Sequence, residues 1–132
     1  MSSPAVDIAQ YLENNNHGTI GADVSGSWSI NISREPSKPD QTVTLYDSGG
    51  DTPEPDANAT RPAIQLRVRA RDYLSAYDQA FAVRNALITP KSIMINGRLY
   101  VGIWATDDIS LLRYDDNNRA ILVANFDIFR EA

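Results

Sequence analysis

One stretch of the chain, Ala63–Leu87, constrains the fold more than any other. In its first nine residues apolar and polar side chains alternate, which is the period of a strand with one buried face. The polar face carries three arginines: Arg67, Arg69 and Arg71. Asp72 then offers an N-cap carboxylate, and apolar residues recur at helical spacing until Pro90 ends the pattern. The stretch therefore predicts a strand that runs directly into an amphipathic helix.

Length, charge and cysteine content exclude several classes of protein. At 132 residues the chain can bury a hydrophobic core of its own, so we expect residues 1–132 to form a single domain. The absence of cysteine excludes a disulfide framework and a cysteine zinc site. The net charge of −5 argues against a general binder of nucleic-acid phosphates. No apolar run approaches the roughly 20 residues of a membrane span, and the N-terminus has no leader pattern, so we expect a soluble protein made in the cytoplasm.

The elements on the N-terminal side of this stretch are short. Ser3 and Pro4 resemble a helix start, and the amphipathic pattern that follows them ends in a polar run at His17 and Gly18. Alternation around Trp28 predicts a strand with one polar face, and Thr42–Tyr46 predicts a second strand.

His17 is the only histidine of the chain. It has no second metal ligand in helical register and no carboxylate placed to orient it, which favours a solvated residue at a helix end over a catalytic or metal-binding role. Neither the central strand nor the helix presents a nucleophile or a convergent pair of carboxylates, so we expect no enzyme, no metal site and no cofactor.

A long segment, Asp47–Pro62, is almost free of apolar residues, and we expect it to be a loop. Its acidic residues are Asp47, Asp51, Glu54 and Asp56. The Gly49-Gly50 pair could suggest a phosphate cradle, but such a cradle needs a following helix N-terminus and usually a lysine. Because ordering each residue costs roughly 1–2 kcal/mol of backbone entropy, we expect this loop to order against a neighbouring subunit.

Beyond Pro90 the pattern is that of strands. Asn96-Gly97 is a strong hairpin signal, and Leu99–Ala105 after it is apolar on both faces, with Tyr100 and Trp104 on the same face. A second hairpin is expected around the turn at residues 115–118, which lacks the glycine and the distal glutamate of a calcium loop. The whole chain therefore predicts an α+β fold, with a mostly antiparallel sheet, two helices packed against it and the order α-β-β-loop-β-α-β-β-β-β.

An ordered set of short motifs resembles the phage minor capsid and tail-terminator family. The set comprises Pro39-Asp40, Leu45–Gly50, Pro62–Arg69, Tyr73 and the terminal strand around Asn125–Phe129. The resemblance implies a small α+β subunit without catalytic residues. It also implies assembly of copies of the chain into a ring, typically a hexamer, at the head-proximal end of a phage tail tube.

In that role the subunit would end tail-tube polymerisation and join the tail to the head. The partners that the resemblance implies are the tail tube protein and a head-tail connector or stopper protein, with DNA only as passing cargo. The location it implies is the tail or neck of the virion, after synthesis in the cytoplasm of the host bacterium. A second interpretation is another neck or head-completion adaptor, or minor capsid protein, that binds portal or connector proteins.

The candidate interface residues lie on surfaces that are apolar or carry several charges of one sign. We expect a closed homo-oligomer that forms through the sheet edges and the helix over residues 72–88, since two apolar strand faces and open edges exceed what a small monomer leaves exposed. The three arginines repel one another unless acidic groups face them. Either the carboxylates of residues 47–56 pair with them across a subunit boundary, or the arginines form a face that only solvent covers. Tyr100 and Trp104 lie either at a subunit interface or under a helix of the same subunit.

Overall fold

The computed structural model describes residues 3–24, 26–50, 58–88 and 91–131 of the chain. The elements in these residues are α1 (Pro4–Asn14), β1 (Thr19–Ile20), β2 (Ser29–Ile32), β3 (Thr42–Gly50), β4 (Ala59–Thr60), β5 (Pro62–Ala70), α2 (Tyr73–Leu87), β6 (Ile93–Ile95), β7 (Arg98–Ala105), β8 (Ser110–Tyr114) and β9 (Ala120–Glu131). The predicted α+β class and element order are confirmed, and β1 and β4 are two-residue strands that the sequence pattern does not reveal.

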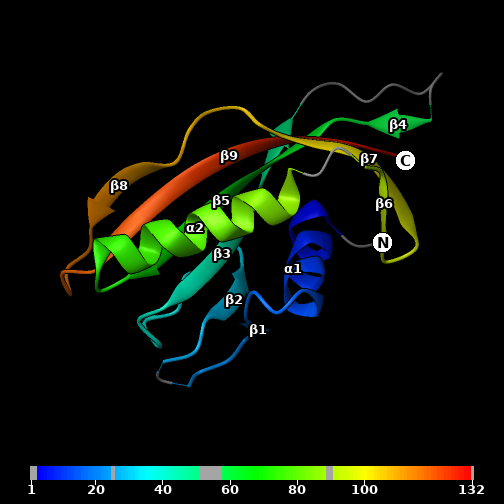
Figure 1. Cartoon of the computed structure of the whole chain (residues 1–132). Coiled ribbons are helices and arrows are strands. Elements are labelled where there is room, and N and C mark those ends of the chain that lie inside the picture. Colours follow the sequence, from blue (N-terminus) through cyan, green and yellow to red (C-terminus); the bar gives the residue numbers. More distant parts are fainter. Residues whose placement is uncertain (1–2, 25, 51–57, 89–90, 132) are drawn as a thin grey trace.

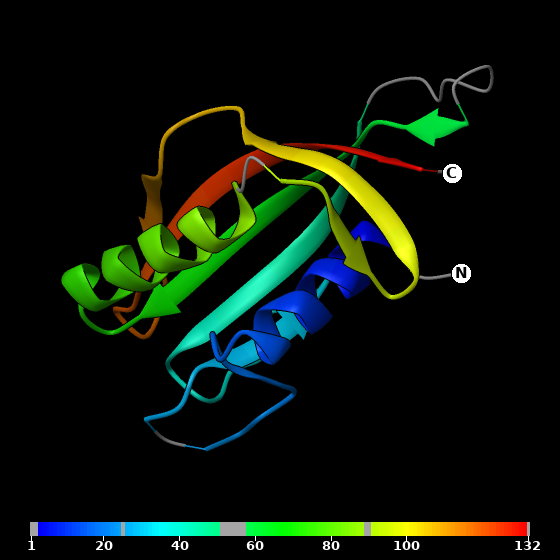
Figure 2. The same ribbon diagram turned by 45° about the vertical axis from the view of Figure 1, so that its right-hand side comes forward.

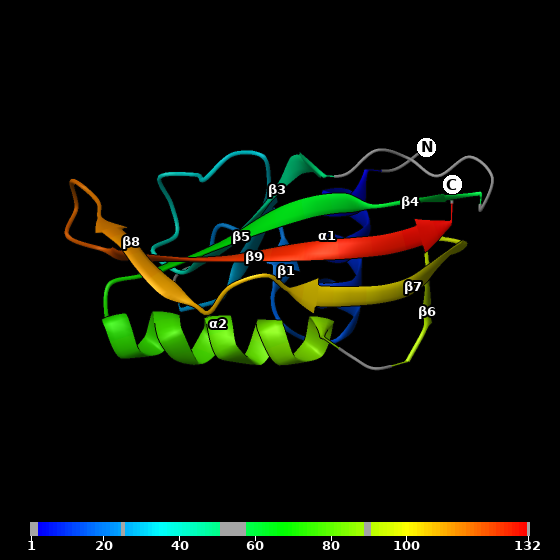
Figure 3. The same ribbon diagram turned by 90° about the horizontal axis from the view of Figure 1, so that it is seen from above.

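Within the described residues the strands form one sheet of nine, with the order β1-β2-β3-β5-β9-β7-β6 and with β4 and β8 also paired to β9. The pairs β1-β2 and β2-β3 are parallel and all other pairs are antiparallel, so the predicted mostly antiparallel sheet is confirmed. Both helices lie on the same face of the curved sheet (Figures 1 and 2). The opposite face carries no helix, and Figure 3 shows the long strands β5 and β9 lying side by side above α2.

The strand and helix predicted first are β5 and α2. Alternate β5 residues Ile64, Leu66 and Val68 are buried in the core that the helices cover. Asp72 caps α2, because its carboxylate accepts a hydrogen bond of 3.3 Å from the Ser75 N–H. The hairpin of β6 and β7 around Asn96-Gly97 is also confirmed, and both turn residues have positive φ, 51° and 76°.

The predicted loop Asp47–Pro62 is shorter than expected at both ends. Strand β3 continues to Gly50 and β5 begins at Pro62, so the prediction is wrong for these flanks, while residues 51–57 lie outside the described part. Backbone pairing between Asp47 and Ile64, and between Gly50 and Pro62 across a bulge, extends the ladder without apolar side chains. Gly50 has φ 111°, and a Cβ there would lie 2.2 Å from the Arg61 carbonyl oxygen, so this position requires glycine.

The alternation predicted for β7 is wrong because the strand contains a bulge. The register with β9 shifts between Tyr100 and Gly102, so that Tyr100 and Ile103 are both buried while Trp104 is 53% exposed. Tyr100 and Trp104 therefore do not share a face. One extra residue is enough to move every later side chain to the other side of the strand.

Candidate functional site

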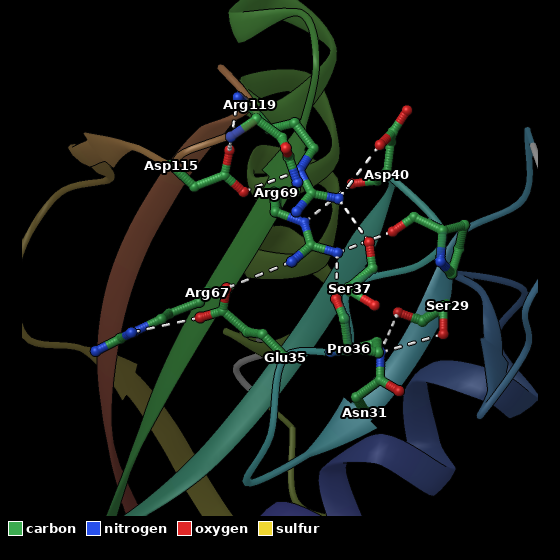
Figure 4. Close-up of polar contacts among 12 residues, drawn as sticks. Ser29, Asn31, Glu35, Pro36, Ser37, Asp40, Arg67, Arg69, Asp115 and Arg119 are labelled. Carbon is green, nitrogen blue, oxygen red and sulfur yellow. Dashed lines mark hydrogen bonds and ion pairs between the residues drawn. The ribbon is translucent and has the colours of Figure 1, made fainter.

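A cluster of ion pairs joins the segment between β2 and β3 to the helix-free face of the sheet (Figure 4). Its cationic members are Arg67, Arg69, Arg71 and Arg119, and its carboxylates are those of Glu35, Asp40 and Asp115. We call this set the arginine cluster. The register of the strands creates it, because Thr44 of β3 is paired with Arg67 and Thr42 with Arg69, which places both arginines beneath the segment at residues 33–41.

Arg69 is the buried centre of the cluster, and only 4% of its surface is exposed. Its guanidinium donates hydrogen bonds to three backbone carbonyls, those of Pro36 at 2.6 Å, Pro39 at 2.8 Å and Asp40 at 3.3 Å. Burial lowers the pKa of Arg69, and the nearby charge of Arg119 acts in the same direction. These carbonyls hold the 33–41 segment in place, so Arg69 serves the fold of its own chain.

Arg119 joins the cluster to the turn between β8 and β9, and the sequence patterns did not identify it. Its guanidinium donates to the Ser37 carbonyl at 2.8 Å, to Asp40 Oδ1 at 3.2 Å and to Asp115 Oδ2 at 2.8 Å. Asp115 also accepts hydrogen bonds from the backbone N–H groups of Asn117 and Arg119, at 3.0 and 2.9 Å. The aspartates and asparagines of this turn therefore belong to an Asx-type turn whose free oxygen binds an arginine.

Arg67 is less buried than Arg69, and 30% of its side chain is exposed. It donates to Glu35 Oε1 at 3.3 Å and to Gln65 Oε1 at 2.9 Å, and its guanidinium lies 5.0 Å from the centre of the Tyr46 ring. The Tyr46 hydroxyl donates to the same Glu35 oxygen at 3.0 Å. Burial, together with the charge of Glu35, raises the pKa of Tyr46 to about 12, so this hydroxyl stays protonated at neutral pH.

Of the acidic residues predicted to face the arginines, only Asp47 lies in the described part of the chain. Within its own chain Asp47 accepts a hydrogen bond of 2.9 Å from the Ala5 N–H in the first turn of α1, and its pairing with an arginine of a neighbouring subunit stays a prediction. The carboxylates that meet the arginines are Glu35, Asp40 and Asp115, which come from other parts of the chain. The remaining predicted partners, Asp51, Glu54 and Asp56, lie outside the described residues.

The two aromatic interface candidates have different surroundings. Tyr100 is fully buried and donates a hydrogen bond to Asp7 Oδ2, while the Arg130 guanidinium donates to both groups, at 3.0 Å to the Tyr100 hydroxyl and 3.3 Å to Asp7. Burial raises the pKa of Tyr100, and the Asp7 carboxylate acts in the same direction. Trp104 lies on the helix-free face, where its indole ring approaches Gly102 closely enough that a Cβ there would lie 2.9 Å from the ring. Of the two, only Trp104 can meet a neighbouring molecule.

Acid should weaken the arginine cluster. The hydrogen bond from Arg71 holds the pKa of Asp40 below its usual value, with Arg119 adding to the effect. Burial of Asp115 tends to raise the pKa of its carboxyl. The backbone and side-chain hydrogen bonds from Arg119 outweigh this effect, so the pKa of Asp115 is lowered as well. Because both carboxyls have a lower pKa in the folded state, their contribution to stability is complete above the unfolded-state pKa, near 4, and is lost as the pH falls below it.

We therefore expect the free energy of unfolding to fall between about pH 5 and pH 2, and the fall to be smaller in a variant with both Asp40→Asn and Asp115→Asn. Urea titrations at a series of pH values measure this directly. As a control, Asp78→Asn changes an exposed carboxylate of α2 and should leave the acid dependence as in the unmodified chain. Equal acid dependence in all three proteins would contradict the assignment.

The described residues hold no cluster of metal ligands and no membrane-spanning helix. They contain no group of three histidine, cysteine, aspartate or glutamate side chains that could hold a metal ion. His17 follows α1 and is half-buried, and its backbone carbonyl accepts a hydrogen bond of 2.9 Å from Gln79 of α2. Neither helix among the described residues is long and apolar enough to cross a membrane.

Large apolar side chains remain exposed in separate places. One group lies on α2 and β8 and consists of Tyr73, Phe81, Leu111, Leu112 and Tyr114, and Leu74 of α2 is exposed as well. A second lies on β6 and β7 and consists of Met94, Val101 and Trp104, and a third, Ile20 and Val24, lies in and just after β1. Exposed apolar groups of this kind are typical of surfaces that contact other proteins.

Comparison with known proteins identifies a family and a shared fold. A family model described as "Bacteriophage tail terminator protein" matches residues 11–131. Eighteen chains of solved structures are similar to this chain, and one of them belongs to a structure described as "Virion of native gene transfer agent (GTA) particle". That chain has a TM-score of 0.65 and 15% sequence identity, over 98% of this chain and 96% of the other, which shows a shared fold. None of the curated proteins matches the sequence.

Proposed function

Because this chain belongs to the bacteriophage tail terminator family, we propose that it assembles with further copies of itself into a ring, a hexamer, at the head-proximal end of a tail tube. There the ring ends polymerisation of the tube protein and provides the surface to which a connector or stopper protein of the head binds. The observation that carries this proposal is the family match over residues 11–131, which covers the last turn of α1, the whole of α2 and every strand of the described sheet.

The arrangement of charges is compatible with a ring subunit. In the arginine cluster four arginines meet three carboxylates within one chain, so these charges support the subunit and do not need a partner. What remains for assembly are the exposed apolar side chains and the open strand edges. We also propose that residues 1–132 act as one domain. All strands of the described part belong to one sheet, and both helices pack with it around one core.

Removing the gene for this chain from a phage that encodes it should abolish joining of heads to tails. It should also leave tails whose tubes vary in length, because nothing then stops the addition of tube subunits. Electron microscopy of the particles measures the distribution of tail lengths, and a plasmid that supplies the unmodified chain should restore it. Tails of normal length that fail only to join heads would contradict the terminator role and favour a head-completion adaptor.

A further inference from the structure

The ring proposed above requires each copy to present two different surfaces, one to each neighbour, because a closed ring of more than two copies is built from head-to-tail contacts. We propose that these surfaces are the exposed apolar group of α2 and β8 on one copy and the segment Ile20–Val24 on the next. This inference rests on the proposed ring and names the part of the chain that closes it.

The first surface combines a helix flank with a strand edge, and we call it the α2–β8 surface. It is formed by Tyr73, Phe81, Leu111, Leu112 and Tyr114, which are between 38% and 51% exposed. One flank of α2 faces α1, where the Tyr11 hydroxyl donates to the Ala86 carbonyl. The other flank faces the β7–β8 connection, where Arg84 and Asp108 form an ion pair of 3.5 Å. Figures 1 and 3 show β8 beside the N-terminal half of α2.

The aromatic residues of this flank are ordered against one another. The rings of Tyr73 and Tyr77 have centroids 6.2 Å apart, and those of Tyr77 and Phe81 are stacked at 6.5 Å. Such a row of rigid aromatic side chains contributes a large apolar contact at a low cost in conformational entropy, as in the energetically dominant parts of protein interfaces. The aromatic side chains of this flank are therefore preorganised for contact with a partner.

Strand β8 is an edge strand, and all five of its residues are exposed. An open edge invites a further strand, but the bulge at Leu112 and the charge of Arg113 both disfavour regular strand addition. We infer that the neighbour contacts β8 through side chains and not by continuing the sheet.

The second surface lies at the opposite end of the sheet. Strand β1 ends the strand order on that side, and its outward N–H, that of Ile20, already donates to Glu13 Oε2 at 2.8 Å. This N–H is therefore not available to a further strand, whereas the side chains of Ile20 and Val24 are 37% and 59% exposed. Because the two apolar surfaces lie at opposite ends of one sheet, repeating the subunit head to tail brings them together.

Charge gives the second reason to choose another copy as the partner. Arg113, on β8, is exposed and forms no ion pair with any residue that the structure describes, in contrast to the arginines of the cluster. Asp23, between Ile20 and Val24, is exposed and likewise unpaired within the described ranges. The two surfaces thus carry one unpaired charge each, of opposite sign, next to apolar side chains of matching exposure.

The absence of cysteine makes the contact directly testable. In a variant with both Val24→Cys and Leu112→Cys, mild oxidation of the assembled protein should link each copy to the next and give a reducible ladder that extends beyond the dimer. The matched control, Val24→Cys with Met94→Cys, uses a residue of β6 that is more exposed than Leu112, 62% against 44%, and should give no ladder. Dimers from Leu112→Cys alone would overturn the inference, because they would show two β8 strands meeting about a two-fold axis.

Charge reversal tests the same contact without a covalent bond. Arg113→Glu should weaken association about tenfold at low salt, Asp23→Arg should do the same, and the two together should restore it, since each single change replaces attraction by repulsion. Arg34→Glu alters an exposed arginine outside both surfaces and should have no effect. Rings that form without the ladder and without rescue would overturn this inference and leave the ring standing, whereas an unmodified chain that stays monomeric with tail tubes present would overturn both.

Discussion

Replacing Asp7 with alanine is expected to lower the free energy of unfolding by about 3–5 kcal/mol, a large part of the 5–15 kcal/mol that stabilises a typical domain. Asp7 is fully buried on α1, and its carboxylate accepts hydrogen bonds from Tyr100, Arg130 and Asn96. Without it the guanidinium of Arg130, a residue that is 8% exposed, remains buried and loses the carboxylate with which it forms an ion pair of 3.3 Å. An unpaired buried charge costs far more than the loss of one hydrogen bond.

Urea denaturation of the purified variant measures this change, with Asp78→Ala as the control. Asp78 is an exposed carboxylate of α2, and its removal should change stability by less than about 0.5 kcal/mol. Tyr100→Phe keeps the Asp7–Arg130 ion pair and removes only the hydroxyl, so its effect should fall between the two. A loss below about 1 kcal/mol in the Asp7 variant would mean that solvent reaches Arg130 and that the pair does not hold α1 to the sheet.

The elements that the sequence predicts well are those whose signals are local. Alternation followed by a capping aspartate identifies β5 and α2, and Asn96-Gly97 identifies the β6–β7 hairpin, because period, cap and turn chemistry each act over a few residues. The end of β3 is different. Asp47–Gly50 is polar and rich in glycine, and it is a strand only because Pro62–Ile64 lies beside it.

The bulge in β7 accounts for the error at Tyr100. Strict alternation places Tyr100 and Trp104 on one face, and no residue of this strand signals that its register will shift against β9. The sequence nevertheless contains a signal for Arg130, which donates a hydrogen bond to the Tyr100 hydroxyl. Alternate residues of the terminal strand are apolar and buried until Arg130 continues the same face, and a cation in that position requires a buried carboxylate.

The partners of the arginines could not be found from the spacing of residues. Alternation places Arg67, Arg69 and Arg71 on one face of a strand, which is confirmed for the two arginines within β5, but it does not show what covers that face. The cover comes from a segment about 30 residues earlier, bent so that three of its carbonyls point at one guanidinium. A loop conformation of this kind depends on the whole fold and leaves no periodic signal.

The arginines should consequently differ in what their removal does, and Arg69 should have the largest effect. Arg69→Ala is expected to lower the free energy of unfolding by about 2–4 kcal/mol, because three backbone carbonyls lose a charged donor and a buried space is left behind. The matched change Arg71→Ala removes a side chain that is 71% exposed and forms an ion pair with Asp40, and it should cost no more than about 1 kcal/mol. Thermal or urea unfolding of the two variants measures the difference.

Hydrogen exchange distinguishes a local anchor from a contact between subunits. If Arg69 holds the 33–41 segment in its own chain, amides of that segment should exchange faster in Arg69→Ala at protein concentrations where the chain is monomeric, and added salt should change this little because the group is buried. A variant of normal stability and normal exchange that fails only to associate, with the defect depending on salt, would instead place Arg69 at a subunit boundary. The burial of its guanidinium beneath Pro36 and Pro39 makes the first result the expected one.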